Sequence, residues 1–263
     1  MNPGIVNVCF MHAIKHHGVP KKLVEIEYDN ATPIEAEVPI ITWSKKQFLT
    51  ESLWDLTGRT TQNGVYETLK PHALAHLVNT QEYLKYIWPM QNYPMGAIVA
   101  HDEIMSLGSK YSIPAQFIYA INQPTLNFLM TKLAKKQIIS EDDLVFADNT
   151  KVNIIGQDSI GIILSYSNKK IIYSNTMHHA NFLGTNATLM QVAIGVLAGL
   201  KEILQRNVPH GINYPENLII DSAFDTISNH MKIEQKIIHH QPRAQVKKTI
   251  TKNTINLPLS IIN

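Results

Sequence analysis

The sequence predicts an α+β fold built on a mixed sheet. Strand patterns and helix patterns follow one another without the regular strand–helix–strand rhythm of a parallel sheet. Short buried or alternating runs indicate strands, and one long run with helical spacing indicates a major helix. The chain has 263 residues, of which 44% are hydrophobic, so it can bury a core for one large domain or two small ones.

The first predicted element is a helix that ends at Gly18. Asn2 is expected to cap this helix and Pro3 to occupy its first turn, where a proline is tolerated. Residues 22–28 then alternate between two faces, which predicts a strand that places two glutamates, Glu25 and Glu27, on one face.

The next segment brings a tryptophan close to a glutamate. Residues 38–43 predict a second strand, which ends at Trp43. Ser44 then caps the predicted helix "KKQFLTESLWDL", which carries Glu51 and ends before the turn at residues 57–58.

The middle of the chain predicts more strands. Residues 96–100 form a short buried strand that leads into His101 and Glu103, and residues 114–120 form another, followed by a helix from 124 to about 136. Residues 160–175 predict a hairpin with its turn at 168, and Asp158 is expected just ahead of its first strand.

The strongest helical pattern follows Asn186, which is the predicted cap. Its apolar residues recur at i, i+3, i+4 and i+7, and they are Leu189, Val192, Ala193, Val196, Leu197, Leu200, Ile203 and Leu204. We expect this stripe to lie in the core.

Charge and cysteine content narrow the function classes. The formal charge is only +2, with acids concentrated in residues 24–55 and Lys and Arg in residues 223–263, which predicts a solvated basic tail and no nucleic-acid site. Cys9 is the only cysteine, so no internal disulfide can form and a reducing cytoplasm fits best. The apolar run 189–200 is shorter than the roughly 20 residues that a bilayer requires, so we expect no membrane span.

Common cofactor and metal motifs are absent from the sequence. No GxGxxG, GxxxxGK[ST], HExxH or GxSxG pattern occurs. His12 and His16 have the i, i+4 spacing of zinc ligands, but no carboxylate follows at a supporting interval, so we expect no metal site.

Several acids near strand ends, together with one tryptophan, suggest a cation site. Each ammonium of an aliphatic diamine needs a carboxylate, and its methylenes or an iminium can lie against an indole. Scattered acids are usually solvated and a tryptophan is usually a core residue, so this pattern alone is weak.

Five ordered segments carry a resemblance. They are "NPGIV" (2–6), "TWSKKQFLTESL" (42–53), "IVAHDEIMSL" (98–107), "GQDSIGIILSYS" (156–167) and "NATLMQVAIGVLAGL" (186–200). Together they resemble the catalytic half of bacterial homospermidine synthases, relatives of the saccharopine dehydrogenases. The resemblance runs to about residue 220 and implies a mixed-sheet catalytic domain of the saccharopine dehydrogenase-like type.

The resemblance implies specific roles. Trp43 matches the tryptophan that supports cationic intermediates, and Glu51 matches a carboxylate across the same pocket. His101 and Glu103 fall on the family's His-x-Glu. Substrate-binding positions fall on Glu27 and Asp158, and Asn2 falls on the asparagine beside the nicotinamide.

The implied activity is aminobutyl transfer from putrescine to putrescine, or to spermidine, with release of ammonia and with NAD as a transient hydride acceptor. A cytoplasmic homodimer is implied. The family's NAD fingerprint lies in an N-terminal domain that this sequence does not show, so we expect a truncated or split gene product. A fragment, or a half that works with a separately encoded NAD-binding partner, stays open as an explanation. The implied division is a remnant of that domain in 1–20, a catalytic domain in 21–185, a helix packing back on the nucleotide-binding side in 186–222 and a tail in 223–263.

Two alternatives remain open. The chain could be a non-catalytic polyamine-binding or dimerisation module. It could also be another saccharopine dehydrogenase-like polyamine enzyme, such as a carboxynorspermidine dehydrogenase. That enzyme has to hold a carboxylate, and Arg59, Arg206 and Arg243, the only arginines, include none that follows a predicted strand end in the pocket.

Overall fold

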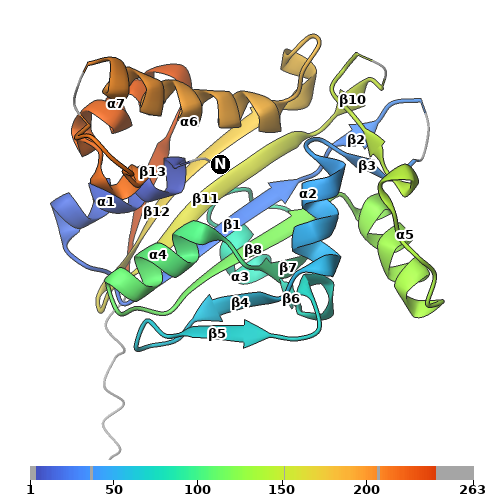
Figure 1. Cartoon of the computed structure of the whole chain (residues 1–263), viewed down its shortest axis with the longest axis horizontal. Coiled ribbons are helices and arrows are strands. Elements are labelled where there is room, and N and C mark those ends of the chain that lie inside the picture. Colours follow the sequence, from blue (N-terminus) through green and yellow to red (C-terminus); the bar gives the residue numbers. More distant parts are fainter. Residues whose placement is uncertain (1–3, 36–37, 151, 206–207, 241–263) are drawn as a thin grey trace, which may run out of the picture.

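A nine-stranded mixed sheet forms the centre of the molecule (Figure 1). The computed structural model describes residues 4–35, 38–150, 152–205 and 208–240. The strand order is β13-β12-β11-β1-β8-β4-β5, and β7 pairs with β8 and with β6. β1 runs parallel to β8 and antiparallel to β11, so the sheet is mixed and the predicted α+β class is confirmed.

The strands of this sheet are β1 (Lys22–Asp29), β4 (Thr57–Thr60), β5 (Tyr66–Leu69), β6 (Leu77–Asn79), β7 (Met95–Val99), β8 (Ala115–Ile121), β11 (Gln157–Ser165), β12 (Lys169–His178) and β13 (Glu234–His239). Two small sheets pair β2 (Thr32–Pro33) with β10 (Ile154–Ile155) and β3 (Ile40–Ile41) with β9 (Val145–Phe146). The helices are α1 (Ile5–His17), α2 (Lys45–Leu49), α3 (Gln81–Leu84), α4 (Asp102–Lys110), α5 (Gln123–Ala134), α6 (Ala187–Leu204) and α7 (Ile220–His230).

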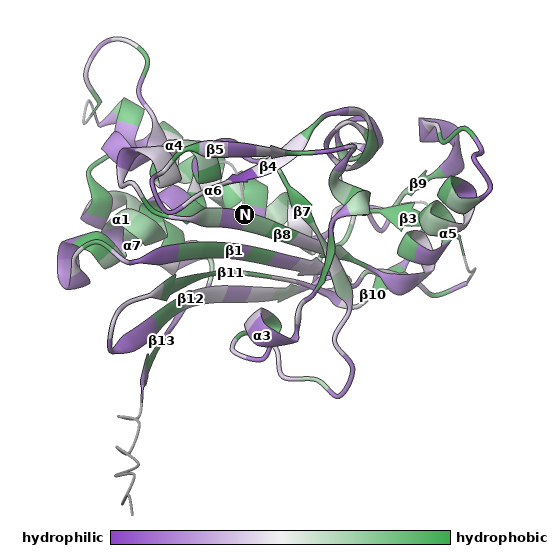
Figure 2. Ribbon diagram, turned by 90° about the horizontal axis from the view of Figure 1, so that it is seen from below, coloured by the Kyte–Doolittle hydropathy of each residue, from purple (hydrophilic) through white to green (hydrophobic). Residues whose placement is uncertain are grey.

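The two faces of the sheet bury different sets of residues. Helices α1, α4, α6 and α7 lie on one face and α3 lies on the other (Figure 2). On β1, Val24 and Ile26 pack in the α3 cluster, whereas Leu23 packs in the main core on the opposite face. Because side chains alternate along a strand, Glu25 and Glu27 lie on the same face as Leu23.

Helix α1 begins after Gly4 and ends at Gly18. Gly4 has φ 81°, a left-handed conformation that favours glycine, and Gly18 caps the last turn as predicted. The expected cap Asn2 lies outside the described residues. Apolar residues of α1 belong to the same core as the sheet.

The helix after Trp43 differs from the prediction. Ser44 does cap it, since its side chain accepts a hydrogen bond from the backbone N–H of Gln47 at 3.2 Å. The α-helical part is only α2, however, and residues Thr50–Trp54 form a π-helical turn that carries Glu51. The strand expected over 38–43 is reduced to the two residues of β3.

The hairpin is longer than expected. β11 starts at Gln157, so Asp158 lies within the strand and not ahead of it. There it is paired with Asp29 of β1 on one side and Met177 of β12 on the other. This pairing places Asp158 beneath the start of α6.

The apolar stripe of α6 is not core. Asn186 caps this helix as predicted, but Val196, Ile203 and Leu204 are 53%, 62% and 73% exposed. Half of the buried residues of this helix are polar, namely Thr188, Gln191 and Glu202. The inward side chains satisfy polar groups of the fold: Gln191 Nε2 donates to Asn175 Oδ1 at 2.9 Å, and Glu202 accepts from Ser222 at 2.6 Å. Helix α6 is also the one described helix that is long and apolar enough to cross a membrane by those two criteria alone, which buried helices of globular proteins also meet.

The expected tail is partly folded. α7 packs against α1 and α6, and β13 extends the sheet beside β12. Residues 223–239 therefore belong to the domain, and residues 241–263 lie outside the described part of the chain.

Candidate active site

A small cavity lies where β1 and β8 meet the first turns of α4 and α6. Its volume is about 100 Å³. Its lining comes from Glu27, Trp43, Glu51, His101, Phe117, Tyr119, Thr188 and Val192. Four of the predicted site residues, namely Glu27, Trp43, Glu51 and His101, thus share one cavity.

The aromatic wall of this cavity is held by its own hydrogen bond. Trp43 Nε1 donates to the hydroxyl of Tyr119 at 3.0 Å, and the two rings meet edge to face. Tyr119 stacks on Phe117 with ring centroids 6.1 Å apart, and burial raises the pKa of Tyr119 well above its usual value. The indole N–H therefore already has a hydrogen-bond partner. A ligand can still contact the π face of the ring.

Glu51 enters the cavity from the π-helical turn. The turn is closed by the N–H of Asp55 donating to the carbonyl of Thr50, five residues back. Turns of this kind are rare and frequent at functional sites. Gln47 donates to Glu51 Oε1 at 2.9 Å, and burial still raises the pKa of the Glu51 carboxyl.

His101 and Glu103 form a close pair at the start of α4. His101 is the N-cap residue of this helix, and its Nδ1 lies 2.5 Å from Glu103 Oε2. Burial on its own would lower the pKa of His101, but the hydrogen bond and the charge of Glu103, with Glu25 and Glu51 nearby, raise it to about 9. The same contact lowers the pKa of Glu103 against the effect of its own burial. His101 is thus a cation at neutral pH.

Glu25 lies next to this pair and was not predicted as a site residue. It is 1% exposed, and neither carboxylate oxygen has a hydrogen-bond partner. Burial and the charge of Glu103 raise its pKa to about 8. The alternation of β1 had already placed Glu25 on the same face as Glu27, and that was the signal available in the sequence.

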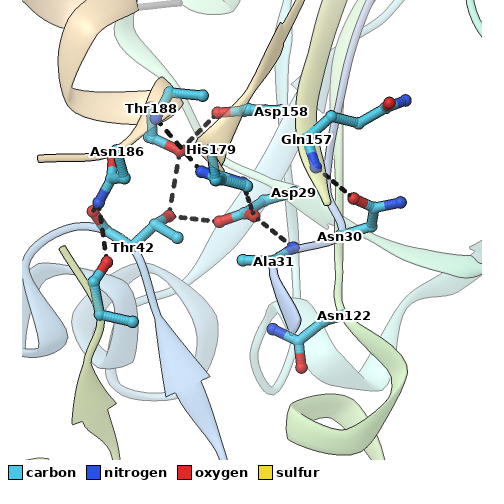
Figure 3. Close-up of polar contacts among 12 residues, drawn as sticks. Asp29, Asn30, Ala31, Thr42, Asn122, Gln157, Asp158, His179, Asn186 and Thr188 are labelled. Atoms are coloured by element: carbon cyan, nitrogen blue, oxygen red, sulfur yellow. Dashed lines mark hydrogen bonds and ion pairs between the residues drawn. The ribbon is translucent and has the colours of Figure 1, made fainter. Parts of the chain in front are cut away.

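Asp158 lies below the cavity and does not line it. It is fully buried, and its Oδ2 lies 2.7 Å from Thr188 Oγ1, which does line the cavity. Asp29 and His179, which were not predicted, complete this buried polar cluster (Figure 3). Glu103 lies behind His101, and Asn2 is outside the described residues.

A second hollow adjoins His101 on the side of α1. Its volume is about 630 Å³, and Asn7, Asp102, Glu103 and Glu216 contribute to its lining. A pyrophosphate needs backbone N–H groups and positive charge, whereas this hollow carries three carboxylates. This hollow therefore does not fit the pyrophosphate of NAD.

The two helical histidines serve packing. The ring of His12 stacks on Phe224 with centroids 3.9 Å apart, and its Nδ1 lies 2.9 Å from the hydroxyl of Tyr173. Among the described residues, no group of three or more His, Cys, Asp or Glu side chains could hold a metal ion.

Comparison with known proteins assigns the fold. No protein-family model matches the chain, and no curated protein matches it in sequence. Solved structures do match, and they define a saccharopine dehydrogenase-like fold. One is the homospermidine synthase from Legionella pneumophila in complex with NAD, with a TM-score of 0.67 and 14% identity. Another is a saccharopine dehydrogenase (L-Glu forming) from Saccharomyces cerevisiae, with a TM-score of 0.51 and 11% identity.

The overlap with these structures is unequal. The match covers 100% of this chain but 61% of the homospermidine synthase, and 88% of this chain and 70% of the saccharopine dehydrogenase. The chain therefore spans less than two thirds of the length of the synthase that it resembles.

Proposed function

We propose that this chain is the diamine-binding part of a homospermidine synthase-like enzyme. The proposed reaction is aminobutyl transfer from putrescine to a second putrescine, or to spermidine, with release of ammonia. NAD would supply the transient hydride acceptor and would be bound by an NAD-binding half outside the described residues, because the hollow beside His101 does not fit its pyrophosphate.

One observation carries this proposal. Glu27 and Glu51 share a cavity with the indole of Trp43. An ammonium is stabilised by a carboxylate, and an iminium also gains from the face of an aromatic ring. The cavity wall therefore supplies what each cationic stage of a diamine reaction needs.

The protonation states indicate which group accepts a proton. An ammonium must lose a proton before its carbon can give up hydride. His101 is already protonated below about pH 9, so it is a poor acceptor at neutral pH. Glu51 is the better candidate because burial raises the pKa of its carboxyl toward neutrality.

Calorimetric titration tests the proposal. We expect putrescine to bind more tightly than 1-aminobutane, because only the diamine brings a second ammonium to the acids. Glu51→Gln should weaken putrescine binding by about tenfold or more, the usual range for a hydrogen bond to a charged group. Glu67→Gln is the matched control, since Glu67 pairs with Arg59 at an exposed site. Equal affinity for the two amines, or no effect of Glu51→Gln, would contradict the proposal.

A second candidate is a non-catalytic polyamine-binding or dimerisation module. The carboxylates in the hollow beside His101, which do not suit a dinucleotide, favour it. A dedicated binder should hold putrescine tightly without NAD, whereas half of an enzyme should bind it weakly until the nicotinamide side is supplied. The affinity for putrescine measured on this chain alone separates the two, because the NAD-binding half is then absent.

A further inference from the structure

A chain of buried oxygens runs beneath the cavity (Figure 3). Asp158 Oδ2 lies 2.7 Å from Thr188 Oγ1, and Thr188 Oγ1 lies 3.1 Å from Thr42 Oγ1. Thr42 in turn contacts Asp29 Oδ2. All of these residues are buried, so water does not compete for the contacts. The direction of each hydrogen bond can therefore be worked out from the number of protons available.

The Asp29 end of this chain only accepts hydrogen bonds. The backbone N–H of Ala187 donates to His179 Nδ1 at 3.2 Å, so Nδ1 carries no proton and Nε2 does. His179 Nε2 then donates to Asp29 Oδ1 at 3.1 Å, and the backbone N–H of Ala31 donates to the same oxygen at 3.0 Å. These two N–H donors favour the carboxylate form of Asp29, whereas Oδ1 of Asp158 accepts no hydrogen bond. With no proton on Asp29 Oδ2, Thr42 donates its hydroxyl proton to that oxygen.

Counting protons along this row of hydrogen bonds determines whether Asp158 is protonated. The single proton of Thr42 is used on Asp29, so the contact between Thr42 and Thr188 requires the proton of Thr188. The contact between Thr188 and Asp158 then requires a proton from Asp158. If Asp158 were ionised, Thr188 would donate to it and the two threonine oxygens would face each other at 3.1 Å without a proton between them.

We propose that Asp158 is a neutral carboxylic acid and that the chain Asp158–Thr188–Thr42–Asp29 runs in one direction, which leaves Thr188 as a hydrogen-bond acceptor toward the cavity. A hydroxyl oxygen has two lone pairs. One accepts from Asp158, and the other is available to a ligand because Thr188 lines the cavity. Thr188 would thus be a further substrate-binding residue that selects an amine or ammonium head group, which brings N–H donors. This substrate class rests on the proposed function.

The surroundings of Asp158 support the neutral form. Its Oδ1 is buried without a hydrogen-bond partner, which is costly for a charged oxygen. Burial, together with the charges of Glu27 and Asp29, raises the pKa of Asp158 well above its usual value. Two ionised carboxylates this close beneath one cavity would repel each other.

The first part of the test is independent of any ligand. At pH 7 the infrared spectrum should contain a protonated-carboxyl band that disappears in Asp158→Asn. A second band of this kind, from Glu25 with its pKa of about 8, should remain in Asp158→Asn and disappear in Glu25→Gln. Asp158→Asn should keep its melting temperature within a few degrees, because the introduced amide can donate to Thr188 as the acid does. Asp29→Asn should melt clearly lower, because Asp29 accepts at both oxygens. Absence of the Asp158 band, or equal damage by Asp158→Asn and Asp29→Asn, would overturn the neutral Asp158.

The second part tests Thr188 as an acceptor, with putrescine as the probe. Thr188→Val should weaken binding by about tenfold, and Thr188→Ser should restore it. Putrescine binding that is unchanged in Thr188→Val would overturn the role of Thr188. If the unmodified protein shows the infrared band of Asp158 but binds no putrescine, the proposed function and the substrate class are wrong. The assigned direction of the hydrogen bonds is then unaffected. If Thr188→Val does not fold, Thr188→Ala takes its place, and putrescine binding that is unchanged in Thr188→Ala would overturn the role of Thr188.

Discussion

At the scale of single residues, the site is a group of carboxylates that the fold keeps from ionising together. Glu25 and Asp158 have raised pKa values because they are buried among other acids. Glu103 keeps its charge because His101 lies against it. Neighbouring environments that separate the pKa values of similar groups are typical of sites that bind or move charge.

Glu25 should make the stability of the protein depend on pH. Its pKa is about 8 in the folded chain and near 4.5 when unfolded, so between these values only the folded state holds the proton. Stability is therefore lost as pH rises through this window, by about 1.4 kcal/mol for each pH unit at most. We expect Glu25→Gln to remove the loss, so that its advantage over the unmodified chain grows from pH 5.5 to pH 8.5 in urea unfolding.

The control for this prediction is Glu67→Gln, since Glu67 is an exposed partner of Arg59 and should show no such trend. Parallel stability curves for Glu25→Gln and the unmodified chain would show that Glu25 is ionised in the folded state.

The sequence located some of these residues and missed others for a physical reason. Alternation along β1 places Glu25 and Glu27 together, and the resemblance points to Trp43 and Glu51. Asp29, Thr188 and His179 meet only through contacts between β1, β11, the turn after β12 and the start of α6, which no local pattern encodes. Local spacing therefore predicted the cavity wall better than the polar cluster beneath it.

At the scale of elements, α6 shows what helical spacing leaves open. The period predicts a helix with an apolar stripe, but it does not say which face turns inward. Here the inward face is fixed by Thr188, Gln191 and Glu202, each of which makes at least one hydrogen bond within the fold. Likewise β13 is exposed along its whole length and is held by pairing with β12, so no apolar pattern marked it as a strand.

Two substitutions on α6 should therefore have effects opposite to those expected from hydropathy. Leu200→Gln, on the exposed stripe, should change the free energy of unfolding by less than about 0.5 kcal/mol. Gln191→Leu should cost about 1–3 kcal/mol, because Asn175 Oδ1 loses its buried donor. Urea unfolding of the two variants measures the difference. A larger loss in the free energy of unfolding for Leu200→Gln would indicate that the stripe is part of the core.

At the scale of the whole molecule, the sheet and its helices build the cavity and leave an apolar helix face uncovered. The exposed residues of this face are Val196, Leu197, Leu200, Ile203 and Leu204. A contiguous apolar surface of this kind commonly marks an interaction site. We expect the separate NAD-binding half to cover it, in keeping with the expected packing of residues 186–222 against the nucleotide-binding side.

This arrangement predicts that the chain does not release ammonia from putrescine with NAD alone. The hollow beside His101 presents Asp102, Glu103 and Glu216 where a pyrophosphate would need N–H donors and positive charge, so NAD should bind with a dissociation constant above about 1 mM, weaker than roughly −4 kcal/mol. Calorimetry with NAD and an ammonia-release assay measure the two quantities on the same sample. Ammonia release at an ordinary enzymatic rate from this chain with NAD would show that the chain completes the cofactor site itself, and the requirement for a second half would then be wrong.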